Sequence, residues 1–158
     1  MTSKDHSGFG LKIPFVEHLG FTLELFESGQ SQISYETRPE HMNTFQVTHG
    51  GAVMTLLDVS MATAARSAQQ DMGVVTIEMK TSFMRPSRGM LVAKGRLMHR
   101  TMTMAFTEST IFDAKGDACA HATGTFKYVR RNDRAATGGD APHAAGAAGS
   151  EISPISTD

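Results

Sequence analysis

The chain has 158 residues, of which 40% are hydrophobic and 20% are charged, and its formal net charge is −1. This composition is typical of one soluble globular domain, and a near-neutral charge without a Lys/Arg block argues against nucleic acid as a main partner. The single cysteine excludes an internal disulfide and a cysteine-based zinc site, and no apolar run is long enough to cross a bilayer.

The hydrophobic periodicity places one domain over residues 11–130, after a flexible N-terminus at residues 1–10. Residues 131–158 contain only two large apolar side chains, Ile152 and Ile155. This segment cannot bury enough surface to offset its ordering entropy, so we expect a disordered tail. The N-terminal residues show no apolar signal segment, which favours a cytoplasmic location.

In chain order, the first expected element is a short helix over Pro14–Leu19, which begins at a proline and ends at Gly20. Two strands follow at residues 21–27 and 32–37, joined by a Ser-Gly turn. Residues 39–48 then form a loop.

The next element is a long helix that begins at Gly50 and runs to about Arg66. Its side chains are apolar nearly all the way round, which is typical of a buried helix. Four alternating segments then predict strands, at residues 74–82, 90–100, 104–113 and 118–129. This order favours an α+β architecture in which a curled antiparallel sheet wraps one central helix. Dimerisation would cover the exposed sheet edges and helix flank.

Two features of the long helix suggest chemistry. Gly50 and Gly51 stand at its start, where free N–H groups and the helix dipole favour developing negative charge. Asp58 is a lone carboxylate on an otherwise apolar helix, which costs free energy unless the group is paired or used. Together they suggest a site that polarises a carbonyl and attacks it.

The spacing of Gly50 and Asp58 predicts the assembly of that site. Asp58 follows Gly50 by eight residues, which is about 12 Å along a helix axis. The two groups of one helix therefore cannot both touch one carbonyl. If both act on one substrate, they come from two chains, so we expect a homodimer with two shared sites.

Asn43, the His49-Gly50-Gly51 sequence, Asp58 and the later segment Thr76–Pro86 resemble the hotdog-fold acyl-CoA thioesterases, specifically their PaaI-like branch. The resemblance spans roughly residues 15–129. It implies the hotdog fold, hydrolysis of an acyl-CoA thioester without a cofactor, and a homodimer that pairs further into a dimer of dimers.

The resemblance also implies a role for each of five residues. The Gly50 N–H would bind the thioester oxygen, and His49 would orient this region or polarise the carbonyl. Asn43, from the same subunit, would position the carbonyl or the attacking water. Asp58 of the other subunit would act as general base or as nucleophile, and Thr76 would hold the water beside it.

Related proteins often carry a basic–Gly–basic turn before the fifth strand, which contacts the coenzyme A phosphates. This chain has His-Arg-Thr-Met-Thr at residues 99–103 and keeps only one of these basic positions, Arg100. The candidates for contacting substrate are therefore Gly51, Lys80, Arg85, Arg88 and Arg100. A plain surface charge is the ordinary alternative for each basic side chain.

Other interpretations stay open at this point. Asp58 could pair with Arg66, Asn43 could be a turn residue, and His49 could be a structural hydrogen-bonding group. The acyl group could be aromatic, of phenylacetyl or hydroxybenzoyl type, or of medium chain length. The second candidate function is a non-catalytic protein that binds or senses acyl-CoA. A lyase or dehydratase would need a different arrangement of His and acid, and no metal site is expected.

Overall fold

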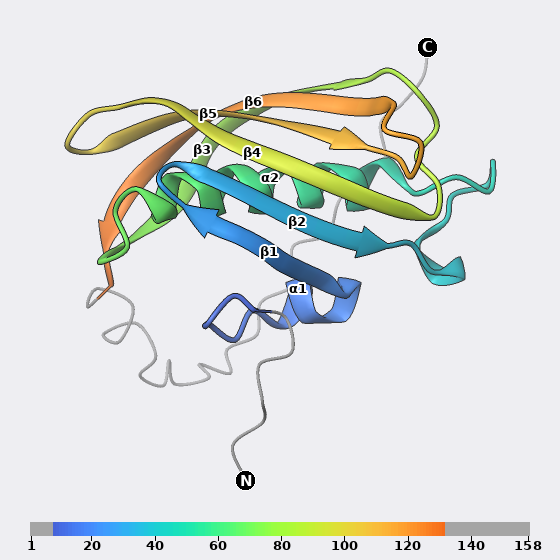
Figure 1. Ribbon diagram of the computed structural model, residues 1–158, viewed down its shortest axis with the longest axis horizontal. Coiled ribbons are helices and arrows are strands. Elements are labelled where there is room, and N and C mark those ends of the chain that lie inside the picture. The colour runs from blue at the N-terminus through green and yellow to red at the C-terminus, as the bar shows by residue number, and fades with distance from the viewer. Residues whose placement is uncertain (1–7, 132–158) are drawn as a thin grey trace, which may run out of the picture.

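The computed structural model describes residues 8–131. This part of the chain forms one long helix against a six-stranded antiparallel sheet, which confirms the expected α+β hotdog architecture (Figure 1). In chain order the elements are α1 (Pro14–Leu19), β1 (Phe21–Glu27), β2 (Gln30–Glu36), the 3₁₀ turn η1 (Pro39–His41), α2 (Gly50–Ser67), β3 (Met72–Phe83), β4 (Met90–Arg100), β5 (Met104–Phe112) and β6 (Ala118–Arg130). No helix in the described residues is both long and apolar enough to cross a membrane.

The strand order differs from the sequence order in one place. Neighbouring strands follow the order β1-β2-β4-β5-β6-β3, so β3 crosses over to the far edge of the sheet and pairs only with β6. The sheet curls around α2, which lies across its inner face and contacts every strand (Figure 1). As a result, both sheet edges, β1 and β3, lie against the same helix from opposite sides.

Most predicted boundaries agree with the structure, and α1 ends at Gly20 in a left-handed conformation, as its sequence indicates. The strand predicted at residues 32–37 is an exception, because β2 already begins at Gln30 and pairs there with β1. The predicted loop at residues 39–48 contains the turn η1. Phe9, which the prediction left in the N-terminal segment, is buried in the core. Most of the predicted tail, residues 132–158, lies outside the described residues.

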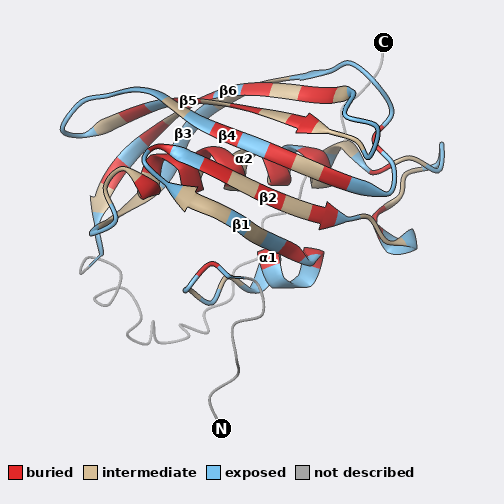
Figure 2. Ribbon diagram, in the orientation of Figure 1, coloured by how far each residue is buried: buried red, intermediate tan, exposed pale blue. Residues whose placement is uncertain are grey.

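One face of α2 is open in a single chain, which agrees with the exposed helix flank expected from the sequence. Val53, Leu56 and Met61 are fully buried against the sheet, but Met54 on the other face is 39% exposed (Figure 2). The sheet of one chain covers only part of the helix circumference, and this open face also carries Asp58, which is half-buried. The apolar residues on the open face therefore need a cover that one chain does not supply.

Close approach of α2 to the sheet depends on Gly95 in β4. A Cβ built at this position would lie 2.5 Å from the Ser60 carbonyl oxygen and 2.5 Å from the Ser31 hydroxyl. These two groups are hydrogen-bonded to each other at 2.7 Å, and Ser60 also bonds to Ser109. Glycine is thus required where the helix backbone meets β4.

We expect Gly95→Ala to lower the free energy of unfolding by about 3 kcal/mol, because backbone atoms of α2 must move to admit the methyl group. Gly124→Ala is the matched control, since its nearest obstacles are side-chain and not backbone atoms, the terminal methyl of Met61 at 3.0 Å and the Phe126 ring at 3.1 Å. Chemical denaturation of both variants measures the difference. Equal losses for the two would contradict a rigid contact at Gly95.

Candidate active site

The N-terminus of α2 is capped by the histidine that precedes it. His49 is the N-cap residue, and its Nδ1 accepts a hydrogen bond from the Gly51 N–H at 2.9 Å. The Gly51 N–H is thus already used within the chain. No hydrogen bond among the described residues uses the Gly50 N–H. Gly50 therefore presents a donor, at the positive end of the helix dipole, that a ligand oxygen can accept.

The loop before α2 holds this donor in place from two sides. The His49 N–H donates to the His41 carbonyl at 2.8 Å, and the Thr48 N–H donates to the carbonyl of buried Ser87 at 2.9 Å. Ser87 lies in the turn between β3 and β4, so residues that are distant in sequence fix the start of α2. Sequence reasoning missed both contacts, because neither residue type signals such a role.

Asn43 organises the same loop. Its Oδ1 accepts from the N–H of Phe45 at 2.9 Å and from the N–H of Val47 at 3.3 Å, which is the turn role considered for this residue. Its Nδ2 makes no hydrogen bond to any described residue. The turn thus leaves an amide donor near the start of α2.

Asp58 and Thr76 are brought together as the sequence predicts. The Thr76 hydroxyl of β3 donates to Asp58 Oδ1 at 2.7 Å. Burial raises the pKa of the Asp58 carboxyl, and the hydrogen bond from Thr76 lowers the same pKa by a smaller amount. Arg66, the alternative partner for Asp58, places its guanidinium over the Phe26 ring. The result is a partly desolvated carboxylate whose hydrogen bond within residues 8–131 comes from one hydroxyl, a state that suits a general base or nucleophile.

We expect Thr76→Val to move the acidic limb of the pH–rate profile to higher pH. The substitution removes the hydrogen bond that lowers the Asp58 pKa, so that pKa rises further and the carboxylate is lost at a higher pH. The rate at the pH optimum should fall by about 10-fold. Thr125→Val is the control, because Thr125 donates to Glu78 on the adjacent strand and makes no contact with Asp58. An unchanged acidic limb in Thr76→Val would contradict the assigned role of the hydroxyl.

Gly50 and Asp58 form two separate half-sites in one chain. Both are in the unbroken helix α2, and β3 lies along it. At one end, a Cβ at Gly50 would lie 3.6 Å from the Phe83 ring. Near the middle of α2, the Thr76 hydroxyl donates to Asp58. One pair of elements therefore lines both the Gly50 N–H and the Asp58 carboxylate.

The predicted basic contacts are spread over the molecule. Arg88 donates to the Gln46 carbonyl at 2.7 Å, in the loop before Gly50, and Arg85 donates to the Ala118 carbonyl at 2.9 Å. Arg100 instead donates to Gln69 Oε1 at 3.1 Å, beyond the C-terminal end of α2. Lys80 is exposed on β3. Among these four side chains of the described residues, Arg88 is the one that is hydrogen-bonded to the loop before α2.

Sequence reasoning also missed exposed apolar side chains around the start of α2. Phe83 is 56% exposed and Phe45 is 81% exposed, and Met54 follows one turn after Gly50. A contiguous exposed apolar patch marks a ligand or partner site, and the Phe83 ring lies beside Gly50. The sequence could have indicated this surface, because Phe83 and Met84 follow each other at the end of a predicted strand.

Comparison with known proteins agrees with the fold and the class of site. The family model described as the thioesterase superfamily matches residues 45–120, a segment that includes Gly50, Asp58 and Thr76. A proposed esterase of Saccharolobus solfataricus is 28% identical to this chain over 105 residues. These residues are 66% of this chain and 75% of that protein.

Solved structures share the fold. The Escherichia coli PaaI protein, from the phenylacetic acid degradation operon, has a TM-score of 0.71 and 19% identity, covering 75% of this chain and 86% of its own. A conserved protein of Pseudomonas aeruginosa has a TM-score of 0.72 and 24% identity, covering 75% and 95%. A Haemophilus influenzae thioesterase has a TM-score of 0.68 and 19% identity, covering 73% and 82%.

Proposed function

We propose that this chain, which belongs to the thioesterase superfamily and has the hotdog fold, hydrolyses the thioester bond of an acyl-CoA to a free acid and coenzyme A. The observation that carries the proposal is the desolvated Asp58 carboxylate, held by Thr76 alone among its described contacts. Such a group costs free energy of folding, and a purely binding site for acyl-CoA has no use for it.

The proposed reaction uses the two half-sites at once. The Gly50 N–H and the positive end of α2 stabilise the oxyanion that forms on the thioester oxygen. With Asp58 as general base, the carboxylate takes a proton from water while the water oxygen attacks the carbonyl carbon. The tetrahedral intermediate then collapses, the C–S bond breaks, and the coenzyme A thiolate leaves and is protonated.

Two details of this reaction belong to the proposal as well. Asp58 could instead attack the carbonyl itself and form a mixed anhydride, which water then hydrolyses to the acid. The free Nδ2 of Asn43 is proposed to orient the thioester or the water. His49 acts through its cap on Gly51, because that contact fixes the first turn of α2.

A second copy of the chain is proposed to complete each site. The edge strand β3 presents Ile77, which is 54% exposed, and Val75, whereas the exposed residues of the other edge strand, β1, are polar and Gly8 lies close to Leu23 of that strand. Antiparallel self-pairing of β3 about a two-fold axis covers these side chains and the open face of α2. It also reverses the partner helix, which carries the partner's Asp58 toward Gly50.

The acyl group is proposed to be aromatic or of medium chain length. Phe83, Phe45 and Met54 supply exposed apolar surface near Gly50, where the carbonyl would bind. Aromatic rings and a flexible thioether suit such acyl groups. Arg88 and Arg85 at this end, and the partner's Arg100, are the proposed contacts for the coenzyme A phosphates.

Thiol release from a panel of acyl-CoA substrates, without added metal or cofactor, tests the function. We expect hydrolysis of phenylacetyl-, hydroxybenzoyl- or medium-chain acyl-CoA well above the rates for acetyl- and palmitoyl-CoA. Calorimetric binding of the same compounds without thiol release would instead support the acyl-CoA-binding alternative and would overturn the enzymatic proposal.

A further inference from the structure

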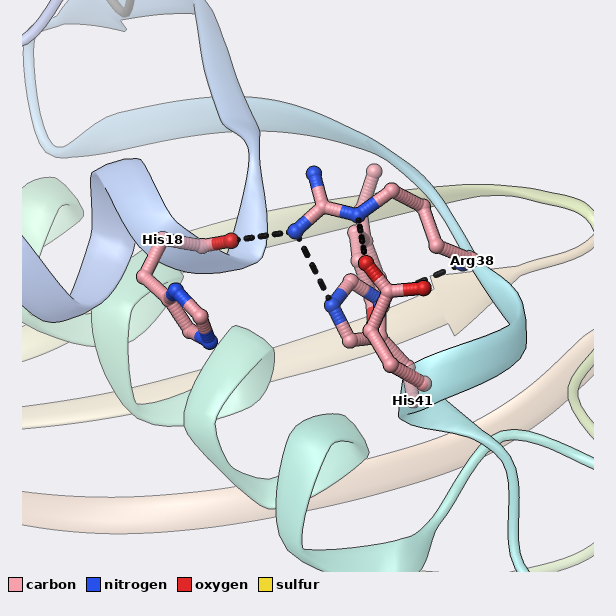
Figure 3. A network of polar contacts seen from close by, with 5 residues as sticks. His18, Arg38 and His41 are labelled. Atoms are coloured by element: carbon pink, nitrogen blue, oxygen red, sulfur yellow. Dashed lines mark hydrogen bonds and ion pairs between the residues drawn. The ribbon is translucent and has the colours of Figure 1, made fainter.

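A network of polar side chains joins α1, β2 and η1 beside the candidate site (Figure 3). Its centre is His41, whose ring is buried and whose Nδ1 lies 2.7 Å from the Tyr35 hydroxyl. The Arg38 backbone N–H also donates to Nδ1, and the Arg38 guanidinium lies 3.2 Å from Nε2. The same guanidinium binds the His18 carbonyl at the end of α1 and forms an ion pair with Glu40.

This network is tied to the rigid core on one side. Tyr35 is fully buried in β2, and its ring packs edge-on against Phe21 with centroids 4.9 Å apart. Burial raises the pKa of Tyr35 to about 12, so its hydroxyl keeps its proton. The hydroxyl therefore offers a fixed donor at a position set by the sheet.

The chemistry of the contacts keeps the His41 ring neutral. The Arg38 backbone N–H can only donate, so Nδ1 is the acceptor and the proton of the neutral ring lies on Nε2, whereas a protonated imidazolium would offer no acceptor. Burial lowers the pKa of His41, the cations of Arg38 and His18 act in the same direction, and Glu40 opposes them. A ring with these contacts on both nitrogens is fixed in orientation.

On its other side the network is hydrogen-bonded to the residue that precedes the N-terminus of α2. The His41 carbonyl accepts the His49 N–H at 2.8 Å, and Gly50 is the next residue. Any residue could supply this carbonyl, but its place relative to the core is set by the side chain of His41. The path from the sheet to the Gly50 N–H thus has only two hydrogen-bonded steps, Tyr35 to His41 and His41 to His49.

We propose that His41, anchored by Tyr35, is a positioning residue that aims the Gly50 N–H at the thioester oxygen. The proposal rests on the proposed function and deepens it, because oxyanion stabilisation requires donors held in one geometry before the reaction. A misplacement of about 1 Å at such a donor can cost up to about 100-fold in rate. His41 touches neither substrate nor water in this scheme and acts only through His49.

Two tyrosine hydroxyls allow a matched test. Tyr35→Phe removes the anchor of His41, and Tyr128→Phe removes a buried hydroxyl that donates to the Ala65 carbonyl near the other end of α2. Each variant loses one buried hydrogen bond, either of α2 or of the segment that leads to it, so both should shift the denaturation midpoint by a similar amount. Only Tyr35→Phe should lower kcat, by about 10-fold, with KM within about two-fold.

A second pair of variants separates positioning from folding. His41→Asn places an amide oxygen where Nδ1 accepts, so it should recover most of the kcat that His41→Leu loses. Amide hydrogen exchange is measured on the same proteins without substrate. We expect the His49 amide to exchange at least about 10-fold faster in Tyr35→Phe than in wild type, with no change in Tyr128→Phe.

Measuring both kcat and His49 amide exchange distinguishes failure of the proposed function from failure of the positioning proposal. If wild type does not hydrolyse acyl-CoA, the proposed function fails, whereas exchange at His49 still tests the positioning proposal. If kcat and His49 exchange are the same in Tyr35→Phe and Tyr128→Phe, or if His41→Leu retains wild-type kcat, His41 is not a positioning residue.

Discussion

Asp58→Asn is expected to lower kcat for acyl-CoA hydrolysis by at least about 100-fold, with KM within about three-fold of wild type. The asparagine amide has nearly the same shape, so it can still meet the Thr76 hydroxyl, but it can neither accept a proton from water nor attack a carbonyl. Steady-state thiol release measures both constants. A variant that keeps the wild-type rate would show that the chemistry lies elsewhere.

The melting temperature of Asp58→Asn distinguishes a catalytic Asp58 from an Asp58 that stabilises the fold. Burial raises the pKa of Asp58 in the folded chain, so the folded state favours the protonated carboxyl more than the unfolded state does. The stability that this group contributes is present below the ordinary pKa of an Asp carboxyl and is lost as the pH rises through the raised value. At pH 7 the ionised group opposes folding, and Asp58→Asn should leave the melting temperature unchanged or raise it. A structural Asp58 would give a lower melting temperature instead.

Glu78→Gln provides the control for charge. Glu78 is a carboxylate on the same strand as Thr76, exposed, and hydrogen-bonded by Thr125. Its replacement removes the same charge as Asp58→Asn, but from the strand beside the helix, and it should leave kcat within about two-fold of wild type. A large loss in this control would mean that the net charge of this region, and not the chemistry of Asp58, governs the rate.

The second large effect is expected from deletion of a single backbone N–H. Gly50→Pro removes the proposed oxyanion donor, while proline is well tolerated at the first position of a helix. His49 has φ of −56° and ψ of 135°, a conformation that suits the residue before a proline. We expect kcat to fall by about 100- to 1,000-fold, the loss typical of a removed oxyanion donor. Gly50→Ala keeps the N–H, and its Cβ meets the Phe83 ring only at ordinary contact distance, so it should lose far less.

Mixing the two inactive proteins tests the shared site. If each site takes Gly50 from one chain and Asp58 from the other, a dimer of one Gly50→Pro chain and one Asp58→Asn chain has one intact site and one doubly defective site. Equal mixing and refolding should then restore about a quarter of the wild-type activity, because half of the dimers are mixed. A site built within one chain predicts no recovery at all.

Local patterns predicted most of the elements well. The alternation in β4 gave its bounds at Met90–Arg100, because its polar residues face outward and its apolar residues face α2. The turn after it could not be placed from glycine or proline, since it closes through the Thr101 N–H and hydroxyl, which bond to the Met104 carbonyl and N–H. The resemblance placed Thr76 on the Asp58 side and gave it the role of holding water, whereas in the structure its hydroxyl donates directly to the carboxylate.

Contacts between segments that are distant in the sequence could not be predicted, for a physical reason. The position of β3 at the far edge depends on pairing with a strand that begins long after it, and no local pattern encodes such a pairing. The role of His41 depends on Tyr35 and His49 meeting it from separate segments, and a lone histidine in a loop carries no such information. An exposed flank of α2 was expected, but the residues that form it were not, because an apolar helix looks the same whether its own sheet or a second chain covers it.

The crossover of β3 to the sheet edge also governs when the site can form during synthesis. β3 leaves the ribosome before β4 and β5, yet its hydrogen-bonding partner within the chain is β6, which emerges after all of them. Until β6 appears, an apolar strand waits unpaired beside a helix that already carries Asp58, and such strands are prone to aggregate. Docking of β6 pairs one side of β3 and completes the sheet beside Asp58 and Thr76, while the outer side of β3 remains the edge that the proposed second copy covers.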